Sequence, residues 1–332
     1  MTTVVEPSRS GRDRVLRAVA RRGPAPFPRH LRPSPALARH FRRETGSDDL
    51  DAWFGLDLRW TYCGRPGRFA FDAELSRGGF DALFDFERVA RQADAWRAAG
   101  LAVVSGYECG TFEQAHEERG LEDLLVDVMT EPAETRGFLD RISANKARIA
   151  AGYARAGVDI VFIGDDMGSQ RALLVREETW QAFFRPPLER IVAAAREVRP
   201  DVTIAYHSCG HIEPLVPHLI ACGVDVLESI QPECNDVPAL VRAHSHQLAF
   251  WGGIGAQSTM ARGTPREVRA AVLRLTGLFG PGTGLIVAPA HTLEPDTPPA
   301  NVVAFVEAVE EANRLAASAS ACEPAAGQEG AR

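Results

Sequence analysis

The chain has 332 residues, of which 45% are hydrophobic and 24% charged, and its formal net charge is −7. These values are ordinary for a folded globular protein, and the length suits one large α/β barrel or two average domains. The mild acidity argues against nucleic acid as a partner, because binding of phosphates needs a basic face. No apolar run approaches the roughly 18 residues of a membrane span, and no signal-peptide pattern is present, so we expect a cytoplasmic protein.

Lysine is almost absent from the chain. Lys146 is the single lysine against 36 arginines, and it lies in Ala144-Asn145-Lys146-Ala147. A P-loop needs Gly-Lys-Ser/Thr, so this class of nucleotide site is excluded. The six cysteines are widely scattered, and in a chain of cytoplasmic character we expect reduced thiols that are available as metal ligands.

Residues 1–45 form a basic, proline-containing N-terminal arm. Residues 1–43 hold 11 arginines against Glu6 and Asp13, a net charge of +9, so the remaining 289 residues carry −16. A short helix is expected around Asp13–Arg22, and prolines then break helical periodicity. We interpret the region as an arm packed on the main body. The alternatives are that some of its arginines close over an anionic ligand, or that it is a transit peptide.

Residues 46–315 alternate between apolar β-branched runs and amphipathic helical stretches. Strand–helix alternation predicts a parallel sheet with crossover helices, and the number of repeats favours a closed (β/α)₈ TIM barrel over an open sheet. Residues 316–332 are rich in Ala, Ser, Gly, Glu and Pro, and we expect a disordered tail. The expected strands are Asp57–Tyr62, Leu101–Gly106, Val158–Gly164, Val202–Tyr206, Val224–Ile230, Leu248–Gly253 and Leu285–Ala288.

Polar residues follow most of these strands directly. In a parallel barrel the active site forms at the carboxyl ends of the strands, so these residues are candidates for a common site. We assign cofactor binding to four of them. These are Tyr107, Glu108, Gln231 and Gln257.

His207-Ser208-Cys209 is the most specific motif. In an extended segment residues i and i+2 point the same way, so the imidazole and the thiol are side by side, and Gly210 permits a tight turn after them. Zinc accepts this mixture of nitrogen and sulfur ligands, and a catalytic zinc site uses three protein ligands and an open position. We choose His291 as the third ligand, with Cys234 and Asp166 in reserve. The alternative is a buried His and Cys without metal.

Asp165-Asp166 is the second candidate group. Adjacent residues in a strand point to opposite faces, so only one of the two carboxylates can face the barrel interior. That one is a candidate catalytic base, an orienting group for a histidine, or a metal ligand. The other would cap the following helix or pair with an arginine.

Residues from about 80 to 312 resemble the uroporphyrinogen decarboxylase superfamily of (β/α)₈ barrels. The resemblance rests on six ordered segments, among them Gly164-Asp165-Asp166, His207-Ser208-Cys209-Gly210, Phe250-Trp251-Gly252-Gly253 and Ala288-Pro289-Ala290-His291. One branch of that superfamily decarboxylates uroporphyrinogen without metal or cofactor. The other transfers methyl groups between corrinoid proteins and thiols, and its His-x-Cys-Gly motif, whose His and Cys bind zinc, matches His207, Cys209 and Gly210.

The resemblance favours the methyltransferase branch. Decarboxylases generally lack that cysteine and carry an early arginine-containing segment for substrate carboxylates that is not found here. His291, however, stands six residues before Thr297-Pro298, where the zinc methyltransferases have a second cysteine and the decarboxylases a histidine. The resemblance thus implies zinc-dependent methyl transfer from a corrinoid, carried by a partner protein, to a thiol. The alternatives are a metal-free decarboxylase of a polycarboxylate and a non-catalytic barrel that binds anions or tetrapyrroles. A homodimer is also expected.

Overall fold

In the part of the chain that the structure describes, seven parallel strands form one curled sheet in the order β1 to β7. The computed structural model describes residues 10–23, 26–64, 79–107, 110–280 and 284–322. Each predicted strand is found: four are shorter at one or both ends, two are shifted by one residue, and the last extends one residue further, to Pro289. The strands are β1 (Leu58–Thr61), β2 (Ala102–Ser105), β3 (Ile160–Gly164), β4 (Thr203–His207), β5 (Val226–Ser229), β6 (Ala249–Ile254) and β7 (Leu285–Pro289).

The expected eighth strand is replaced by part of the N-terminal arm. The backbone of His30 donates to Val287 O (3.0 Å), and Val287 donates to Pro28 O (2.9 Å), so this segment lies beside β7. On its other side, Asp57, just before β1, donates to Arg29 O (3.3 Å). Proline has no N–H to donate, and Pro28 and Pro33 therefore keep the segment from forming a regular strand. The prediction of eight strands is wrong for the described residues, where the sheet has seven strands and this irregular segment.

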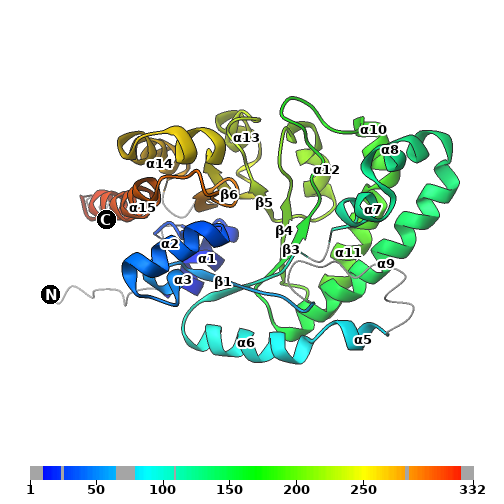
Figure 1. Ribbon diagram of the computed structural model, residues 1–332, viewed down its shortest axis with the longest axis horizontal. Coiled ribbons are helices and arrows are strands. Elements are labelled where there is room, and N and C mark those ends of the chain that lie inside the picture. The colour runs from blue at the N-terminus through cyan, green and yellow to red at the C-terminus, as the bar shows by residue number, and fades with distance from the viewer. Residues whose placement is uncertain (1–9, 24–25, 65–78, 108–109, 281–283, 323–332) are drawn as a thin grey trace, which may run out of the picture.

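Helices cover the outside of the sheet. In Figure 1, α9 and α11 lie together on one side of the molecule and α14 and α15 on the other. The helices are α1 (Gly11–Val19), α2 (Pro35–Thr45), α3 (Leu50–Trp53), α5 (Phe80–Leu83), α6 (Phe86–Ala98), α7 (Phe112–Arg119), α8 (Leu121–Thr130), α9 (Pro132–Ala156), α10 (Glu177–Phe183), α11 (Arg185–Val198), α12 (Val216–Ala221), α13 (Val237–His244), α14 (Pro265–Phe279) and α15 (Pro299–Cys322), with short helices η1 (Glu213–Leu215) and η2 (Ala256–Met260).

Three boundaries differ from the sequence-based expectation. The stretch 121–156 is two helices, because Pro132 starts a new helix where its missing N–H costs nothing. Likewise α10 and α11 meet at Phe184, just before Pro186 and Pro187. Helix α15 extends to Cys322, so residues 316–322 are helical and the expectation of disorder there is wrong; residues 323–332 lie outside the described part of the chain. None of the described helices is long and apolar enough to span a membrane.

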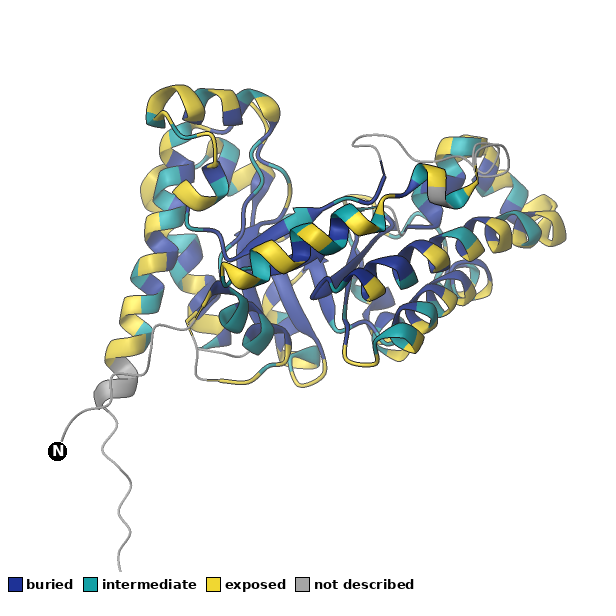
Figure 2. Cartoon of the chain, turned by 90° about the horizontal axis from the view of Figure 1, so that it is seen from below, coloured by how far each residue is buried: buried dark blue, intermediate teal, exposed yellow. Residues whose placement is uncertain are grey.

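The strands alternate between two apolar layers. Ala102, Val104, Ile160 and Phe162 belong to the cluster inside the barrel, whereas Val103 and Val161 pack against the outer helices. This is the period of two that a strand imposes. Figure 2 shows the sheet as a buried layer beneath helices with exposed outer faces.

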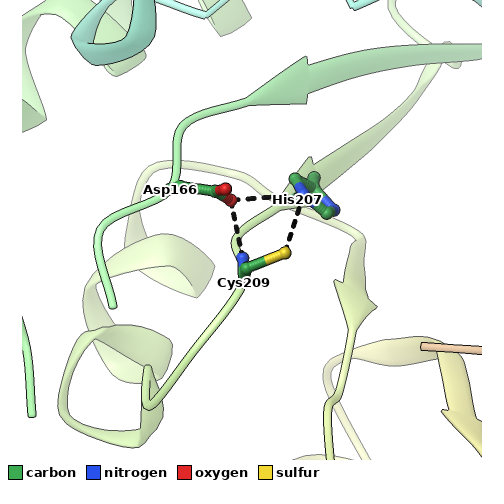
Figure 3. Close-up of side chains that lie close together, drawn as sticks. All are labelled: Asp166, His207 and Cys209. Atoms are coloured by element: carbon green, nitrogen blue, oxygen red, sulfur yellow. Dashed lines mark hydrogen bonds and ion pairs between the residues drawn. The ribbon is translucent and has the colours of Figure 1, made fainter. Parts of the chain in front are cut away.

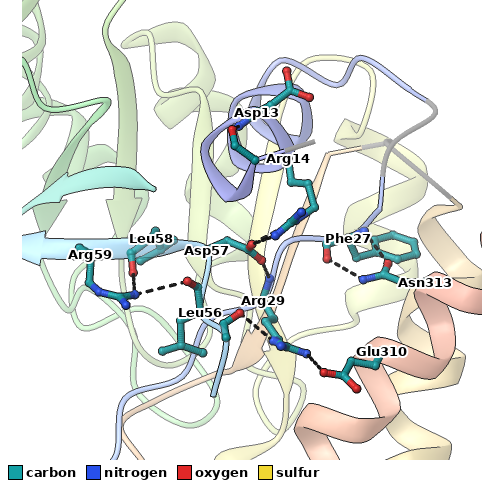
Figure 4. A network of polar contacts seen from close by, with 12 residues as sticks. Asp13, Arg14, Phe27, Arg29, Leu56, Asp57, Leu58, Arg59, Glu310 and Asn313 are labelled. Carbon is teal, nitrogen blue, oxygen red and sulfur yellow. Dashed lines mark hydrogen bonds and ion pairs between the residues drawn. The ribbon is translucent and has the colours of Figure 1, made fainter. Parts of the chain in front are cut away.

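Helix α1 of the arm covers the amino ends of the strands. Val15 and Ala18 join the interior cluster, and polar contacts anchor the helix (Figure 4). Arg12 pairs with Asp159 (2.8 Å), Arg14 pairs with Asp57, and Arg29 pairs with Glu310 of α15 (2.8 Å). These arm arginines bind carboxylates of the barrel itself, which agrees with the interpretation of an arm packed on the main body.

Candidate metal centre

Three potential metal ligands meet where β3 and β4 end. His207 is the last residue of β4, Cys209 follows it by two, and Asp166 follows the end of β3 by two. Because β3 and β4 are parallel neighbours with Gly164 opposite His207, their carboxyl ends deliver these side chains to one place. We call Asp166, His207 and Cys209 the trio; Figure 3 shows the three side chains together.

The donor atoms of the trio are spaced as a metal site requires. The Nε2 atom of His207 lies 3.2 Å from Asp166 Oδ1 and 3.6 Å from Cys209 Sγ. In a tetrahedral zinc site the bond lengths imply separations of roughly 3.3 Å for N and O ligands and roughly 3.5 Å for N and S ligands. All three atoms lie within 4.8 Å of one another. The trio therefore fits a zinc ion in both donor chemistry and spacing.

A buried carboxylate orients the histidine. Glu228 of β5 is 5% exposed, and its Oε2 contacts His207 Nδ1. This contact leaves Nε2 to face Asp166 and Cys209, which is the carboxylate–histidine arrangement found behind many metal ligands. Sequence reasoning missed Glu228 because it considered the residues that follow each strand. The signal was present, since an acid inside an otherwise apolar strand needs a buried partner.

Charge in the site is divided between these groups. Burial opposes a charge on His207, but Glu228 and the hydrogen bonds with Asp166 and Cys209 together raise the pKa of the imidazole well above its usual value. Burial likewise opposes ionisation of Asp166, but the hydrogen bond and charge of His207 lower the pKa of this carboxyl. Without a metal ion, the imidazolium thus balances the carboxylates. A metal cation would take over that role, because a ligand histidine must be deprotonated at the binding nitrogen.

Two glycines allow the loops to close around the trio. Gly210 has φ +81°, and a Cβ there would lie 2.4 Å from the Gly168 backbone. A Cβ on Gly168 would lie 2.7 Å from Cys209 O. The backbone N–H of Cys209 donates to Asp166 Oδ1 (2.7 Å), which fixes the two loops together. The predicted tight turn at Gly210 is confirmed.

A pocket of about 550 Å³ lies over the trio. Asp166 and Cys209 line it, while His207 is 6% exposed and lies deeper. Its other polar residues come from the loops after β3 and β5 to β7, and include Gln170, Gln231, Gln257, Arg262, His291, Glu294 and Asp296. The pocket therefore gives a small polar molecule access to the trio.

The two aspartates have different roles. Asp165 is buried and its Oδ1 accepts hydrogen bonds from the backbone of Phe112 (2.7 Å) and Glu113 (3.2 Å) at the start of α7. Burial raises the pKa of Asp165 to about 7 against these hydrogen bonds. Asp165 thus fastens α7 to β3, and Asp166 is the aspartate that reaches the pocket. The sequence left this choice open.

His291 lines the pocket but is not part of the trio. It is exposed, and its Nδ1 lies 3.1 Å from Thr292 O. Instead, Asp166, which the sequence analysis gave as an alternative third ligand, lies next to His207 and Cys209. Cys234, the other reserve, donates to Gln170 (2.8 Å) and also stays outside the trio.

The predicted cofactor-binding residues are dispersed around the site. Gln231 is buried and its Oε1 accepts from Gly210 N (3.0 Å), so it supports the turn as well as lining the pocket. Gln257 accepts from Gln170 at the pocket edge (3.0 Å). The Tyr107 ring stacks on Trp60 with centroids 5.1 Å apart, and its buried hydroxyl has no hydrogen-bond partner among the described residues. Glu108 lies outside the described residues.

The comparison with known families matches this part of the molecule. The sequence model of uroporphyrinogen decarboxylase (URO-D) matches residues 114–312, more than half of the chain. The chain belongs to the uroporphyrinogen decarboxylase family. The matched range of this family member includes all of the trio, Glu228 and His291.

Individual similar proteins carry different names. Uroporphyrinogen decarboxylases of Pseudomonas paraeruginosa and Legionella pneumophila (strain Lens) are 25% and 24% identical over 54% and 58% of the chain. The chain covers only 49% and 52% of those relatives, about half of their length. A solved structure of a methyltransferase from Methanosarcina mazei superposes with a TM-score of 0.71 at 15% identity, covering 92% of this chain and 99% of that one. At this identity the likeness shows the barrel fold.

Proposed function

We propose that this protein transfers a methyl group from a methylated corrinoid, carried by a partner protein, to a thiol with the help of zinc. The observation that carries the proposal is the trio itself, with nitrogen, sulfur and oxygen donors at zinc-like spacing beneath an accessible pocket. Asp166, His207 and Cys209 would hold the ion. When bound there, zinc lowers the pKa of a thiol and so makes thiolate available near neutral pH.

The identity of the third ligand supports thiol chemistry. A set of His207, Cys209 and His291 would carry one negative charge, from the thiolate. With Asp166 in place of His291 the set carries two, the same as a site with two cysteines and one histidine. A more negative ligand set leaves the acceptor sulfur more electron-rich, and hence a better nucleophile.

The remaining residues would position and protect this centre. Glu228 fixes the imidazole so that Nε2 faces the pocket side, and Asp165 anchors α7 beside it. In the transfer, the cobalt–carbon bond of the methylated corrinoid would break and leave cobalt(I) with the bonding electrons, while a carbon–sulfur bond forms on the acceptor. The proton released by the acceptor thiol has to leave through the pocket. Glu294 and Asp296 line the pocket, and either carboxylate could accept the proton.

The direct test is methyl transfer from methylcobalamin to a panel of small thiols by the zinc-loaded protein. We expect turnover that requires zinc and disappears in C209A, measured by the spectral change of the corrinoid and by mass spectrometry of the thioether. The matched control is L278E, which changes an exposed leucine on α14 and should retain full turnover. Zinc bound in stoichiometric amount without any transfer to any thiol of the panel would contradict the proposed reaction.

Decarboxylation of a polycarboxylate is the second candidate, and Arg32 is the observation that favours it. Its guanidinium lies over the rings of Tyr107 (4.7 Å) and Trp60 (5.1 Å), and it has no ion pair among the described residues. A guanidinium held in this way can bind a substrate carboxylate. Release of CO₂ from uroporphyrinogen by the metal-free protein, lost in R32A, would support this candidate against methyl transfer.

A further inference from the structure

Three charged side chains line one wall of the pocket over the trio. They are Arg262, which follows η2, and Glu294 and Asp296, which follow β7. All three are exposed, and none of them has an ion pair within the described part of the chain. Opposite charges that line one pocket without pairing there are available to a ligand that carries charges of both signs. We call these three residues the charged wall.

The charged wall lies across the pocket from the trio. The trio comes from the ends of β3 and β4, whereas the charged wall follows β6 and β7, further along the curled sheet. Gln170, from the loop after β3, and Gln257, from η2, both line the pocket and share a hydrogen bond of 3.0 Å. Two glutamine side chains therefore span this part of the pocket, so a small molecule with its sulfur at the trio can reach the charged wall.

A buried glutamine lies between the trio and the charged wall. Gln231 follows β5, lines the pocket and is 4% exposed. Its Oε1 accepts from the Gly210 backbone N–H (3.0 Å), and because that group can only donate, the orientation of the amide is fixed. Its Nε2 makes no hydrogen bond with any described residue. Since a buried amide donor ordinarily has an acceptor, Gln231 is free to donate to a ligand in the pocket.

We propose that the methyl acceptor is the thiol of an α-amino acid, bound with its sulfur at the trio and its ammonium and carboxylate groups at the charged wall. Arg262 and Nε2 of Gln231 would bind the carboxylate, and Glu294 or Asp296 would bind the ammonium group. The inference rests on the proposed function, since it names the class of thiol that receives the methyl group. In the transfer the S–H bond breaks and its proton leaves through the pocket, a carbon–sulfur bond forms, and cobalt(I) keeps the electron pair of the cobalt–carbon bond.

The charges disfavour simpler thiols as acceptors. A thiol that carries only an acid group would pair with Arg262 but would leave both carboxylates of the charged wall without a cation. A thiol that carries only an amine would leave Arg262 without an anion. Sites built for a polar ligand reject analogues that leave their polar groups unpaired. An α-amino acid satisfies both signs of charge at once.

Calorimetric titration tests binding separately from methyl transfer. The ligand is L-methionine, the thioether that transfer to homocysteine would produce, added to zinc-free and to zinc-loaded protein. We expect saturable binding that falls about 10-fold or more for N-acetylmethionine, which lacks the ammonium group, and for methioninamide, which lacks the carboxylate. Equal binding of all three ligands, or no binding of methionine by either form of the protein, would overturn the inference.

Variants assign each charge of the ligand to its residues. R262A should weaken methionine about 10-fold and leave methioninamide unchanged, and E294Q/D296N should weaken methionine and leave N-acetylmethionine unchanged. Q231E keeps an acceptor for the Gly210 N–H and removes the free donor, so it should behave as R262A does. Methionine binding that neither R262A nor E294Q/D296N weakens would overturn the assignment.

Two matched controls come from neighbouring helices. Arg266 of α14 and Glu307 of α15 are exposed and do not line the pocket. R266A and E307Q remove the same charges as the test variants, and both should bind methionine as the wild type does. A loss in these controls equal to that in R262A and E294Q/D296N would attribute the effect to net charge and overturn the inference.

Turnover with three related thiols separates the inference from the proposed function. With methylcobalamin as donor, homocysteine should have a KM about 10-fold or more below those of mercaptobutyrate, which lacks the ammonium group, and aminopropanethiol, which lacks the carboxylate. Equal KM values for the three thiols would overturn the inference and leave methyl transfer standing. No turnover with any thiol would overturn methyl transfer, and the methionine titrations would still decide whether the pocket binds an α-amino acid.

Discussion

Acidic side chains gather at both ends of the barrel, but the two ends neutralise them differently. At the amino ends, Asp57, Asp159 and Asp225 each precede a strand and each pair with an arginine: Arg14, Arg12 and Arg196 respectively. Each also accepts a hydrogen bond from a backbone N–H, for example Asp159 from Val103 (2.9 Å) and Asp225 from Ile204 (2.8 Å). These carboxylates are fully satisfied by the chain itself.

At the carboxyl ends the charges converge on one histidine. Glu228 contacts Nδ1 of His207, and Asp166 contacts its Nε2. The Cys209 thiol also lies next to Nε2. No arginine pairs with either carboxylate among the described residues. At the amino end, the ion pairs therefore hold the strands and the arm together. At the carboxyl end, the donor atoms stay available to bind a cation.

Removal of a ligand should have the largest effect. H207A and C209A each take away one donor of three, and we expect both to lose stoichiometric zinc. The measurement is metal content after dialysis, by mass spectrometry, beside a thermal melt to show that the fold remains. C209S is the closer control for packing. If C209A retained about one zinc ion per chain, Cys209 would not be a zinc ligand.

The choice between Asp166 and His291 can be sharpened in the same way. D166A should weaken zinc binding strongly, because it removes a donor 3.2 Å from His207 Nε2, whereas H291A should change it little. Competition with a chromophoric chelator gives both affinities. If H291A bound zinc more weakly than D166A, His291 would be the third ligand instead of Asp166.

A substitution at the amino end should lower the stability of the fold and leave zinc binding unchanged. D57A removes the buried partner of Arg14 and of the Arg29 N–H, and we expect a loss of about 3 kcal/mol in the free energy of unfolding. D94A is the control, because Asp94 forms a surface pair with Arg97 on α6 and should change nothing measurable. Urea denaturation compares the two. An equal response in both variants would mean that the arm is not anchored through Asp57.

The smallest of these effects is expected from the orienting carboxylate. E228Q keeps the shape but removes the negative charge behind His207, and losses of this kind typically weaken metal binding about 10–100-fold. The same chelator competition measures it, with E294Q as a control that lines the pocket without touching His207. Zinc affinity unchanged in E228Q would show that the contact serves packing alone.

Much of this architecture follows from sequence pattern. The strand periodicity predicts all seven strands, and the His207-Ser208-Cys209 spacing correctly places two donors on one side of a strand end. Asp166 and Glu228 were harder to assign. Asp166 lies beside His207 because Gly168, in the loop after β3, and Gly210, in the loop after β4, let the two loops pack closely. Glu228 lies opposite His207 because their strands pair in that register. Both depend on contacts between segments distant in the sequence.

The arm shows the same limit. Its composition predicts an irregular basic segment, but nothing local reveals that residues 28–34 occupy the place of an eighth strand beside β7. That position is set by backbone hydrogen bonds to Val287 and Leu293, more than 250 residues later. Tertiary context therefore decides whether proline-rich segments join a sheet.

The most direct test of the metal centre is X-ray absorption at the zinc edge of the zinc-loaded wild-type protein. The trio predicts one sulfur ligand at about 2.3 Å, with the other ligands nitrogen and oxygen. The sulfur should vanish in any zinc that C209S retains. A spectrum with no sulfur, or with two sulfurs as a second cysteine would give, would contradict a site built from Asp166, His207 and Cys209.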